Sequence, residues 1–437
     1  MNKVISAAVL SVLSLALAGA DLYVGQARGG EKGPGTRLAP FKAIPDALRK
    51  AKPGDVIHVA QGNYAGVTGA SEILIDKPVT IIGGYSIDFA VRDVVKHPTM
   101  VQPPNDRNDT KSPERGLIVL KLPEGKGPDM VIDGFVIDQG YMNSYHQTRG
   151  KSLGVETGMW LEGPAKGAKD KFPSADVASI CAPASGRYEG NIVIRNCVIV
   201  NSGNCGIRLS LFRGGVKIEN NVFAACRAAA CEVSTPNTED NAVTCEFADN
   251  TVLFTWSRHP NLVGMGYGFR CMDKVVSDIH HNIFGLNVFS GVGNDSGDMK
   301  SKRIKLDCNI FFLNRKSDVA VMKSPKTIHL TVGTEEFDDL SDFPGMESVE
   351  GNTVLKKPGA FKEVLNQPYL AAFLRVAFSK EEDYEEDSPV NVFREAMGIK
   401  KALKEKPGFL MYCNRYPLKD AFKLFGVCKG CGAQTVK

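Results

Sequence analysis

The stretch Ile218-Glu219-Asn220-Asn221-Val222-Phe223 decides the fold of this 437-residue chain, because its pattern recurs. Each copy has apolar residues, then a polar corner, then more apolar residues. Further copies lie at 194–199, 248–253, 279–284 and 306–311, and an earlier copy at 132–137 has Gly134 at the corner. From the copy at 194–199 onward, successive corner positions are 24, 29, 32 and 27 residues apart; they are Cys197, Asn221, Asn250, Asn282 and Asn309. This spacing is typical of single coils of a solenoid whose loops vary in length.

The repeat predicts strands that stack coil upon coil. One coil cannot bury its apolar side chains alone, whereas stacked coils share a continuous core. Stacked asparagines form hydrogen-bonded ladders and tolerate the left-handed backbone of a tight corner. A β-sandwich would instead give strands spaced about 8–12 residues apart and no column of one residue type. We therefore expect an all-β fold, a parallel β-helix.

The N-terminus has the features of a signal peptide. Lys3 precedes an apolar run at 4–17, and Ala18-Gly19-Ala20 is a small-x-small cleavage site. The run is too short for a membrane anchor, which needs about 20 residues. We expect residues 1–20 to be removed and the mature chain to begin at Asp21, with no transmembrane segment. The protein would then be secreted, periplasmic or attached to the cell surface.

Patterning divides the mature chain into three parts. Residues 21–66 form an N-terminal cap and first coil, with Phe41, Ile44, Leu48 and Ala51 at the spacing of a capping helix. Residues 67–334 form the β-helix, with Gly-, Pro- and Lys-rich loop insertions near 104–128 and 141–188. Residues 335–437 lose the repeat and are partly helical, so we expect a C-terminal extension that packs on the β-helix or caps it.

Composition narrows the functional classes. Hydrophobic residues make up 43% of the chain, which excludes disorder, and a formal charge of +4 is too weak to predict nucleic-acid binding. The 11 cysteines are an odd number, so at least one is unpaired in the monomer. The pairs Cys226/Cys231 and Cys428/Cys431 are close enough in sequence for disulfides, with free thiols as the alternative. Zinc at the second pair lacks a fourth ligand at useful spacing.

Several motifs resemble one known group. The Ile-x-Asn-Asn-x-Phe copies, the stretch Gly206-Ile207-Arg208-Leu209, and the openings at 35–64 and 81–93 resemble the pectate-lyase-like superfamily of right-handed parallel β-helices over about residues 21–330. The resemblance implies three strands per coil, with the third strand on the face that usually binds substrate. It does not specify an activity, since the superfamily holds lyases, hydrolases, esterases, adhesins and non-catalytic proteins.

The resemblance places the third strands at 159–162, 207–210, 231–234, 269–272 and 319–322. Alternation along them then points Trp160, Arg208, Glu232 and Arg270 outward in one row. Arginines bind carboxylates and an exposed tryptophan stacks on sugar rings, so the row predicts binding of an extracellular, anionic (uronate-containing) polysaccharide. Oligomeric state is not set by the sequence.

Cleavage by β-elimination is an open extension of this hypothesis. It would use Arg208 or Arg270 to neutralise the uronate, Glu232 beside them, and Lys274 or His259 as the base. Arg258 and His259, in the loop before the Arg270 strand, are further substrate-binding candidates. The tripeptide Arg303-Ile304-Lys305 is similar to one in polygalacturonases, but their paired aspartates have no clear equivalents, so a lyase is favoured over a hydrolase.

Two alternatives stay open. The Arg–Glu–Arg row is also what a stabilising ladder between coils would contain, in a non-catalytic structural or adhesive protein of the cell surface or envelope. No metal or other cofactor is assigned with certainty. Calcium is a further hypothesis at Asp295 and Asp298 or at Asp106 and Asp109, although neither pair has the spacing of a known calcium loop.

Overall fold

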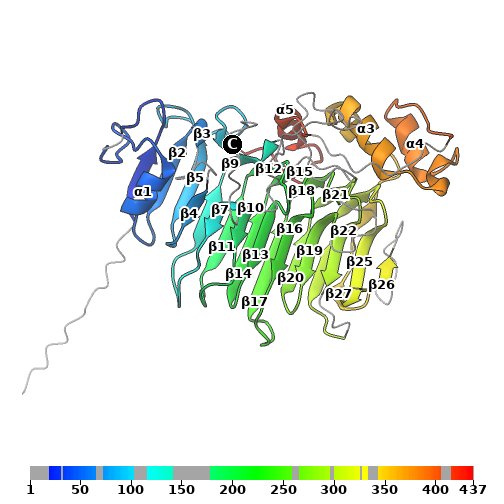
Figure 1. Cartoon of the computed structure of the whole chain (residues 1–437), viewed down its shortest axis with the longest axis horizontal. Coiled ribbons are helices and arrows are strands. Elements are labelled where there is room, and N and C mark those ends of the chain that lie inside the picture. Colours follow the sequence, from blue (N-terminus) through cyan, green and yellow to red (C-terminus); the bar gives the residue numbers. More distant parts are fainter. Residues whose placement is uncertain are drawn as a thin grey trace, which may run out of the picture.

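The chain forms a right-handed parallel β-helix, as predicted (Figure 1). The computed structural model describes residues 19–436 except 31–32, 65–71, 103–115, 141–177, 258–264, 296–299, 325–326, 333–342 and 405–414. Its strands form three long sheets, here named A, B and C, and each coil contributes one strand to each sheet in that order. Strands pair in parallel along every sheet, apart from an antiparallel last pair in sheet C.

The bounds of the elements follow the sheets. Sheet A contains β1 (Asp21–Val24), β2 (Val56–Ala60), β5 (Thr80–Tyr85), β8 (Met130–Asp133), β11 (Asn191–Arg195), β14 (Gly214–Glu219), β17 (Val243–Ala248), β20 (Val276–His280), β23 (Ile304–Asp307) and β27 (Met346–Ser348). Sheet B contains β3 (Gly62–Tyr64), β6 (Thr99–Val101), β9 (Phe135–Asp138), β12 (Val198–Val200), β15 (Val222–Ala224), β18 (Thr251–Leu253), β21 (Ile283–Gly285), β24 (Ile310–Phe312) and β28 (Thr353–Val354). Sheet C contains β4 (Ile73–Ile75), β7 (Gly116–Leu120), β10 (Ala178–Ala182), β13 (Ile207–Ser210), β16 (Ala229–Ser234), β19 (Tyr267–Met272), β22 (Ser290–Asp295), β25 (Ser317–Ser324) and β26 (Thr327–Val332).

The predicted asparagine column exists as a buried ladder at the corner between sheets A and B. Its members are Asn221, Asn250, Asn282 and Asn309, which we call the asparagine ladder. The Asn250 side chain accepts from the backbone and side-chain amides of Asn221, both at 3.0 Å, and donates to Asn282 Oδ1 at 3.1 Å. The left-handed backbone falls one residue earlier than expected, for example at Asn220 (φ 57°). The ladder asparagine therefore stabilises the corner through its side chain.

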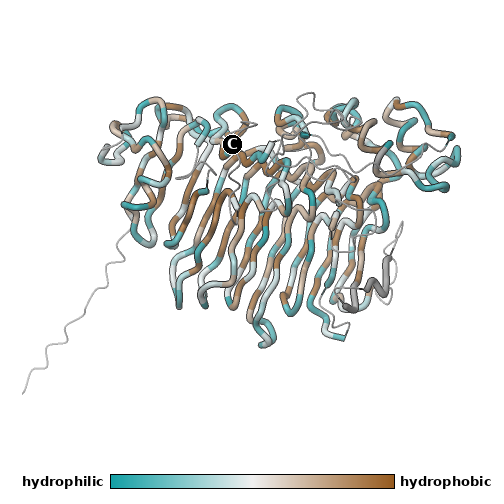
Figure 2. The backbone as a smooth tube through the Cα atoms, in the orientation of Figure 1, coloured by the Kyte–Doolittle hydropathy of each residue, from teal (hydrophilic) through white to brown (hydrophobic). Residues whose placement is uncertain are grey.

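Apolar side chains from all three sheets fill the inside of the coil, and Figure 2 shows hydrophobic residues recurring along the strands. Phe223, Phe247, Phe284 and Phe311 stack along the axis with ring centroids 5.4–6.2 Å apart. Phe223, Phe284 and Phe311 share one position of sheet B, and Phe247 of sheet A completes the stack in the coil where that position is Val252. At the N-terminal end, α1 (Ile44–Lys50) buries Ile44, Ala47 and Leu48 against the first coil, as the predicted cap requires.

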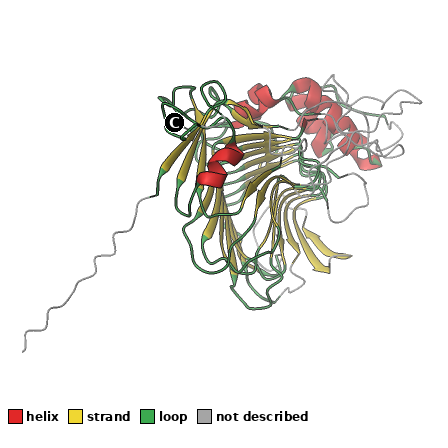
Figure 3. Ribbon diagram, turned by 60° about the vertical axis from the view of Figure 1, so that its left-hand side comes forward, coloured by secondary structure: helices red, strands yellow, loops and turns green. Residues whose placement is uncertain are grey.

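The C-terminal extension packs along sheet B (Figures 1 and 3). It contains α2 (Phe361–Val364), α3 (Gln367–Ala377), η3 (Glu381–Tyr384), α4 (Pro389–Ala396), α5 (Leu418–Ala421) and η4 (Phe422–Leu424). Phe254, outside the coil, packs its ring 5.1 Å from Phe373 and 5.3 Å from Tyr416. Among the helices described, none is long and apolar enough to cross a membrane.

Three expected boundaries were wrong. The coil repeat continues through β27 and β28 to residue 354, beyond the expected limit of 334. Strand β7 lies inside the loop expected near 104–128, and β10 inside the loop expected near 141–188. The Gly- and Pro-rich insertions around these strands masked five-residue apolar strands whose burial depends on the neighbouring coils.

Candidate functional site

Two faces of the β-helix are candidates for binding, because the extension covers sheet B. On sheet C, the predicted third strands at 207–210, 231–234, 269–272 and 319–322 are confirmed as parts of β13, β16, β19 and β25. Arg208, Glu232 and Arg270 are in register on neighbouring strands, so the sequence placed them correctly side by side. The next position in this row is Gly293 of β22.

These residues form a chain of ion pairs that sequence reasoning left incomplete. Arg208 Nε lies 3.0 Å from Glu232 Oε1, and Glu232 Oε2 lies 3.0 Å from Arg270 Nη1. Arg270 Nη2 then pairs with Asp295, at the end of β22. We call Arg208, Glu232, Arg270 and Asp295 the sheet C network.

Most of the sheet C network is buried. The side chains of Glu232, Arg270 and Asp295 are 8%, 10% and 1% exposed. Burial raises the pKa of Asp295 despite the opposing attraction of Arg270. Burial alone would lower the pKa of Arg270, but Glu232 and Asp295 outweigh it and raise that pKa. Arg270 therefore pairs with two buried carboxylates. This arrangement matches a stabilising ladder between coils better than a cation that is free to bind a ligand.

Arg208 differs from the rest of the network because its side chain is 60% exposed. Its contact with Glu232 uses Nε, and its two terminal amino groups have no hydrogen-bond partner among the described residues. A guanidinium fixed in this way can bind a carboxylate with two parallel hydrogen bonds. Beyond Arg270, the Tyr267 ring lies over Gly293, where a Cβ atom would approach it to 2.5 Å. A glycine is therefore required at that point of the row.

The other predicted site residues do not join the network. Lys274 Nζ donates to the Thr238 carbonyl at 2.6 Å and pairs with Asp240 at 3.0 Å, in a separate cluster that also contains Arg303. Trp160, Arg258 and His259 lie outside the described residues. The strand expected at 159–162 also lies outside them. In sheet C the neighbour of β13 is β10, which sets Cys181 opposite Arg208.

The described part of the chain does not support the metal and disulfide hypotheses. No group of three or more His, Cys, Asp or Glu side chains there is arranged to hold a metal ion. Asp106, Asp109 and Asp298 lie outside it, and Asp295 belongs to the sheet C network. Cys226, Cys231, Cys428 and Cys431 are free thiols, so neither expected local pair is bonded. Burial raises the pKa of Cys226 and of Cys431 to about 12, which makes both unreactive.

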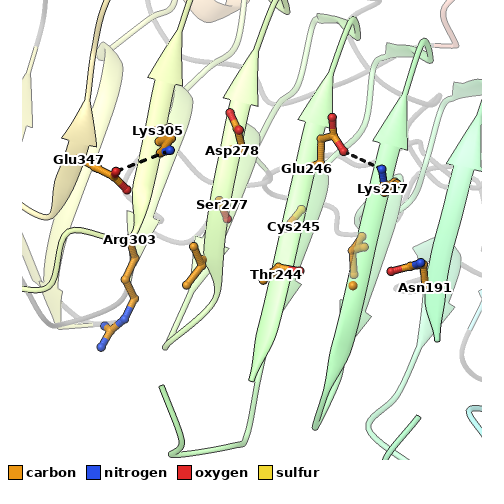
Figure 4. A pocket seen from close by; sticks show the side chains of 13 residues that line it. Asn191, Lys217, Thr244, Cys245, Glu246, Ser277, Asp278, Arg303, Lys305 and Glu347 are labelled. Carbon is orange, nitrogen blue, oxygen red and sulfur yellow. Dashed lines mark ion pairs between the residues drawn. The ribbon is translucent and has the colours of Figure 1, made fainter. Parts of the chain in front are cut away.

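Sequence reasoning missed a second surface, an open groove of about 340 Å³ on the outer face of sheet A (Figure 4). Lys217, Glu246, Asp278 and Lys305 are in register across β14, β17, β20 and β23 and line it; we call them the sheet A row. Side chains alternate inward and outward along the first strand of each coil as they do along the third, and this alternation points the four side chains outward. The same pattern in the sequence could therefore have predicted the sheet A row.

The sheet A row places two adjacent carboxylates between two lysines at the surface. Lys217 Nζ lies 3.1 Å from Glu246, and Lys305 Nζ lies 3.6 Å from Glu347, as the dashed lines in Figure 4 mark. The hydrogen bond to Glu246 raises the pKa of Lys217, which stays protonated. Asp278 stands between Glu246 and Lys305 and is exposed, with no ion pair to any described residue. The groove thus presents ions of both signs to solvent.

Comparisons with known proteins do not identify a function. A family described as "Protein of unknown function (DUF1565)" matches residues 27–96, and no curated protein matches the chain. A structure of XylC with xylose is 12% identical to this chain, with a TM-score of 0.35. The match covers 69% of this chain but only 63% of the XylC chain. A lacto-N-biosidase from Eubacterium ramulus shares 11% identity (TM-score 0.27; 77% of this chain, 67% of that one). A rhamnogalacturonan lyase also shares 11% (TM-score 0.26; 70% and 71%). Identities of 11–12% are too low to transfer a function.

Proposed function

We propose that this chain is an exported β-helix protein that binds a polysaccharide along sheet A, without cleaving it. The observation that carries the proposal is the sheet A row itself: four ionisable side chains in register, lying in an open groove. A polymer that crosses the strands would meet one such side chain per coil. Parallel strands are about 4.8 Å apart, so the four strands offer a contact line of about 14 Å.

The chemistry of the row suits a ligand rich in hydroxyl groups. Carboxylates accept hydrogen bonds from hydroxyls, and ammonium groups donate to them. Hydrogen bonds with one charged partner are stronger than neutral ones. Two lysines and two carboxylates give the row no net charge, which favours a neutral or weakly charged glycan over a polyanion. This differs from the uronate preference that the arginines of sheet C predict.

Sheet C supports a second candidate, a contact with carboxylate-bearing polymers at Arg208. The exposed guanidinium, fixed by Glu232, favours it. Elimination chemistry has less support there. The two terminal nitrogens of Arg270 are paired with buried carboxylates, and the proposed base Lys274 is held by Asp240.

The test is affinity electrophoresis of the mature protein against a panel of neutral and acidic polysaccharides. We expect at least one glycan to retard the protein, and Asp278→Asn and Lys305→Ala to weaken that binding about tenfold each, since a charged hydrogen bond contributes roughly 1.5–3 kcal/mol. Glu395→Gln is the matched control, because Glu395 is an exposed carboxylate on α4 with a lysine partner. Retardation by no glycan, or equal binding by all variants, would contradict the proposal.

Arg208→Ala tests the second candidate in the same gels with polygalacturonate and alginate. Its control is Arg195→Ala on sheet A, because Arg195 is likewise half-exposed and paired through Nε with a buried carboxylate, Asp133, at 2.8 Å. Loss of binding in the first variant alone supports the Arg208 contact. Growth of ultraviolet absorbance from unsaturated uronates would show lyase activity and refute binding without cleavage.

A further inference from the structure

Two adjacent histidines, His280 and His281, lie at the end of β20, just beyond the sheet A row. His280 follows Asp278 by two residues, so alternation places it on the same outer face of sheet A. His281 occupies the corner that follows, with a left-handed backbone (φ 55°) and an exposed side chain. Neither histidine lines the groove. The pair therefore borders the proposed binding surface.

The two imidazole rings are in direct contact. Their Nδ1 atoms lie 2.9 Å apart, and the ring planes are nearly perpendicular, at 89°. Two ring nitrogens at this distance need one hydrogen atom between them, because one must donate and the other must accept through its lone pair. The contact is therefore compatible with no charge or with one positive charge on the pair. A second positive charge would set two N–H groups against each other and break it.

The other ring nitrogen of His280 faces the sheet A row. His280 Nε2 lies 3.5 Å from Glu246 Oε1, and the second oxygen of that carboxylate lies 3.1 Å from Lys217 Nζ (Figure 4). Glu246 thus connects the groove to the histidine pair. A neutral His280 makes at most a long hydrogen bond to this carboxylate, whereas a protonated one forms a charge-assisted pair with it.

The other titratable groups near the pair come from three elements. Asp249, at the corner after β17, has its pKa raised by burial, and the charges of His281 and His280 oppose that effect. Asp307 of β23 is the neighbour of His280 in register and already accepts two hydrogen bonds. The C-terminal extension contributes Cys431, a buried thiol whose pKa is raised to about 12. A positive charge on the pair is therefore balanced by carboxylates on both sides.

We propose that His280 is a positioning residue for Glu246 and makes ligand binding in the sheet A groove weaker at acid pH. Histidine changes its charge between about pH 5 and 8. A neutral His280 leaves Glu246 able to accept from a ligand hydroxyl. A protonated His280 holds Glu246 between two cations, where it is a poorer acceptor. This inference rests on the proposed polysaccharide binding at sheet A and concerns the regulation of that site.

The first experiment follows proton uptake by the ligand-free, mature, full-length chain, using NMR of histidine-labelled protein from about pH 8 to about pH 5. We expect His280 and His281 to titrate as a coupled pair. Glu246→Gln should move proton uptake by His280 to lower pH, because a nearby negative charge is lost. His58, whose carboxylate partner Asp21 lies 2.9 Å away on β1, should not respond. Independent titration of the two histidines, or no response of His280 to Glu246→Gln, would overturn the proposal.

The second experiment repeats the glycan electrophoresis at about pH 7.5 and about pH 5.5. The wild type should bind about fivefold more weakly at the lower pH, since one hydrogen bond contributes roughly this factor. His280→Gln keeps an amide beside Glu246 but cannot take up a proton, so its affinity should differ little between the two pH values. His58→Gln is the matched control, because β2 contributes nothing to the groove, and it should keep the wild-type pH dependence.

The two experiments separate failure of this inference from failure of the proposed function. Coupled titration without retardation by any glycan would refute binding at sheet A, and the regulation with it. Glycan binding that is equal or stronger at the lower pH would refute the role of His280 alone. The same holds for a pH dependence that His280→Gln leaves unchanged.

Discussion

Arg270→Met tests whether the sheet C network is structural. The substitution keeps the volume and apolar stem of the side chain but removes the charge that pairs with Glu232 and Asp295. Removing one partner of a buried pair costs about 3–5 kcal/mol, because the remaining charge is left buried. Unfolding entropy is roughly 2.1 cal/mol/K per residue, so about 400 residues give about 0.8 kcal/mol/K. A cooperative transition should then lose about 4–6 °C in Tm.

The loss should depend on pH in a defined direction. Burial already raises the pKa of Asp295 in the folded protein, and loss of Arg270 raises it further. A carboxylate with a raised folded pKa destabilises the fold once pH rises above its unfolded pKa, because ionisation is then easier in the unfolded chain. Protonation at acid pH removes that penalty. The Tm difference between wild type and Arg270→Met should therefore be largest near pH 7 and shrink towards pH 4.

Thermal melting followed by circular dichroism at both pH values measures this difference. Arg208→Met is the control, because its exposed ion pair should contribute no more than about 1 kcal/mol. A loss of less than 1 °C for Arg270→Met, or a loss that grows at acid pH, would refute the structural role of Arg270. It would return Arg270 to the set of candidate ligand contacts.

Three other outcomes are expected. Asn250→Ala removes four side-chain hydrogen bonds of the asparagine ladder and should destabilise the fold by about 2–4 kcal/mol in thermal melts. Asn191→Ala, which removes a solvent-exposed hydrogen bond to Asp129, should change little; equal Tm values for the two variants would mean that the ladder does not stabilise the corners. Among the described cysteines, the exposed Cys308 should be labelled by a thiol reagent well before the buried Cys226, as peptide mass spectrometry measures; labelling of Cys226 as fast as that of Cys308 would show that buried thiols open readily. N-terminal sequencing of exported protein should begin at Asp21, where β1 also begins, and a retained leader would contradict the signal peptide.

The repeat predicted the fold because each copy combines two independent signals, apolar strands and a corner asparagine. Alternation then placed Arg208, Glu232 and Arg270 in register, since side chains of successive coils align once the period is known. It could not place Asp295, because the glycines of β22 carry no inward or outward signal. It also did not find β10 beside β13, because a long stretch of sequence between β9 and β10 breaks the period.

Burial is the property that the sequence could not supply. Arg208 and Arg270 occupy equivalent positions, yet one is exposed and the other is held between two carboxylates. Whether an outward residue is covered depends on the side chains around it, which for Arg270 are Tyr267, Glu232 and Asp295. The groove on sheet A was overlooked for a related reason: the resemblance directed attention to the third strand of each coil.

Hydrogen–deuterium exchange with and without the glycan that the electrophoresis identifies tests the central proposal most directly. Binding along the sheet A row should slow exchange in peptides from β14, β17, β20 and β23 and leave those from sheet C unchanged. Protection confined to β13, β16 and β19, or no protection anywhere at a saturating glycan concentration, would contradict the assignment of sheet A as the polysaccharide-binding face.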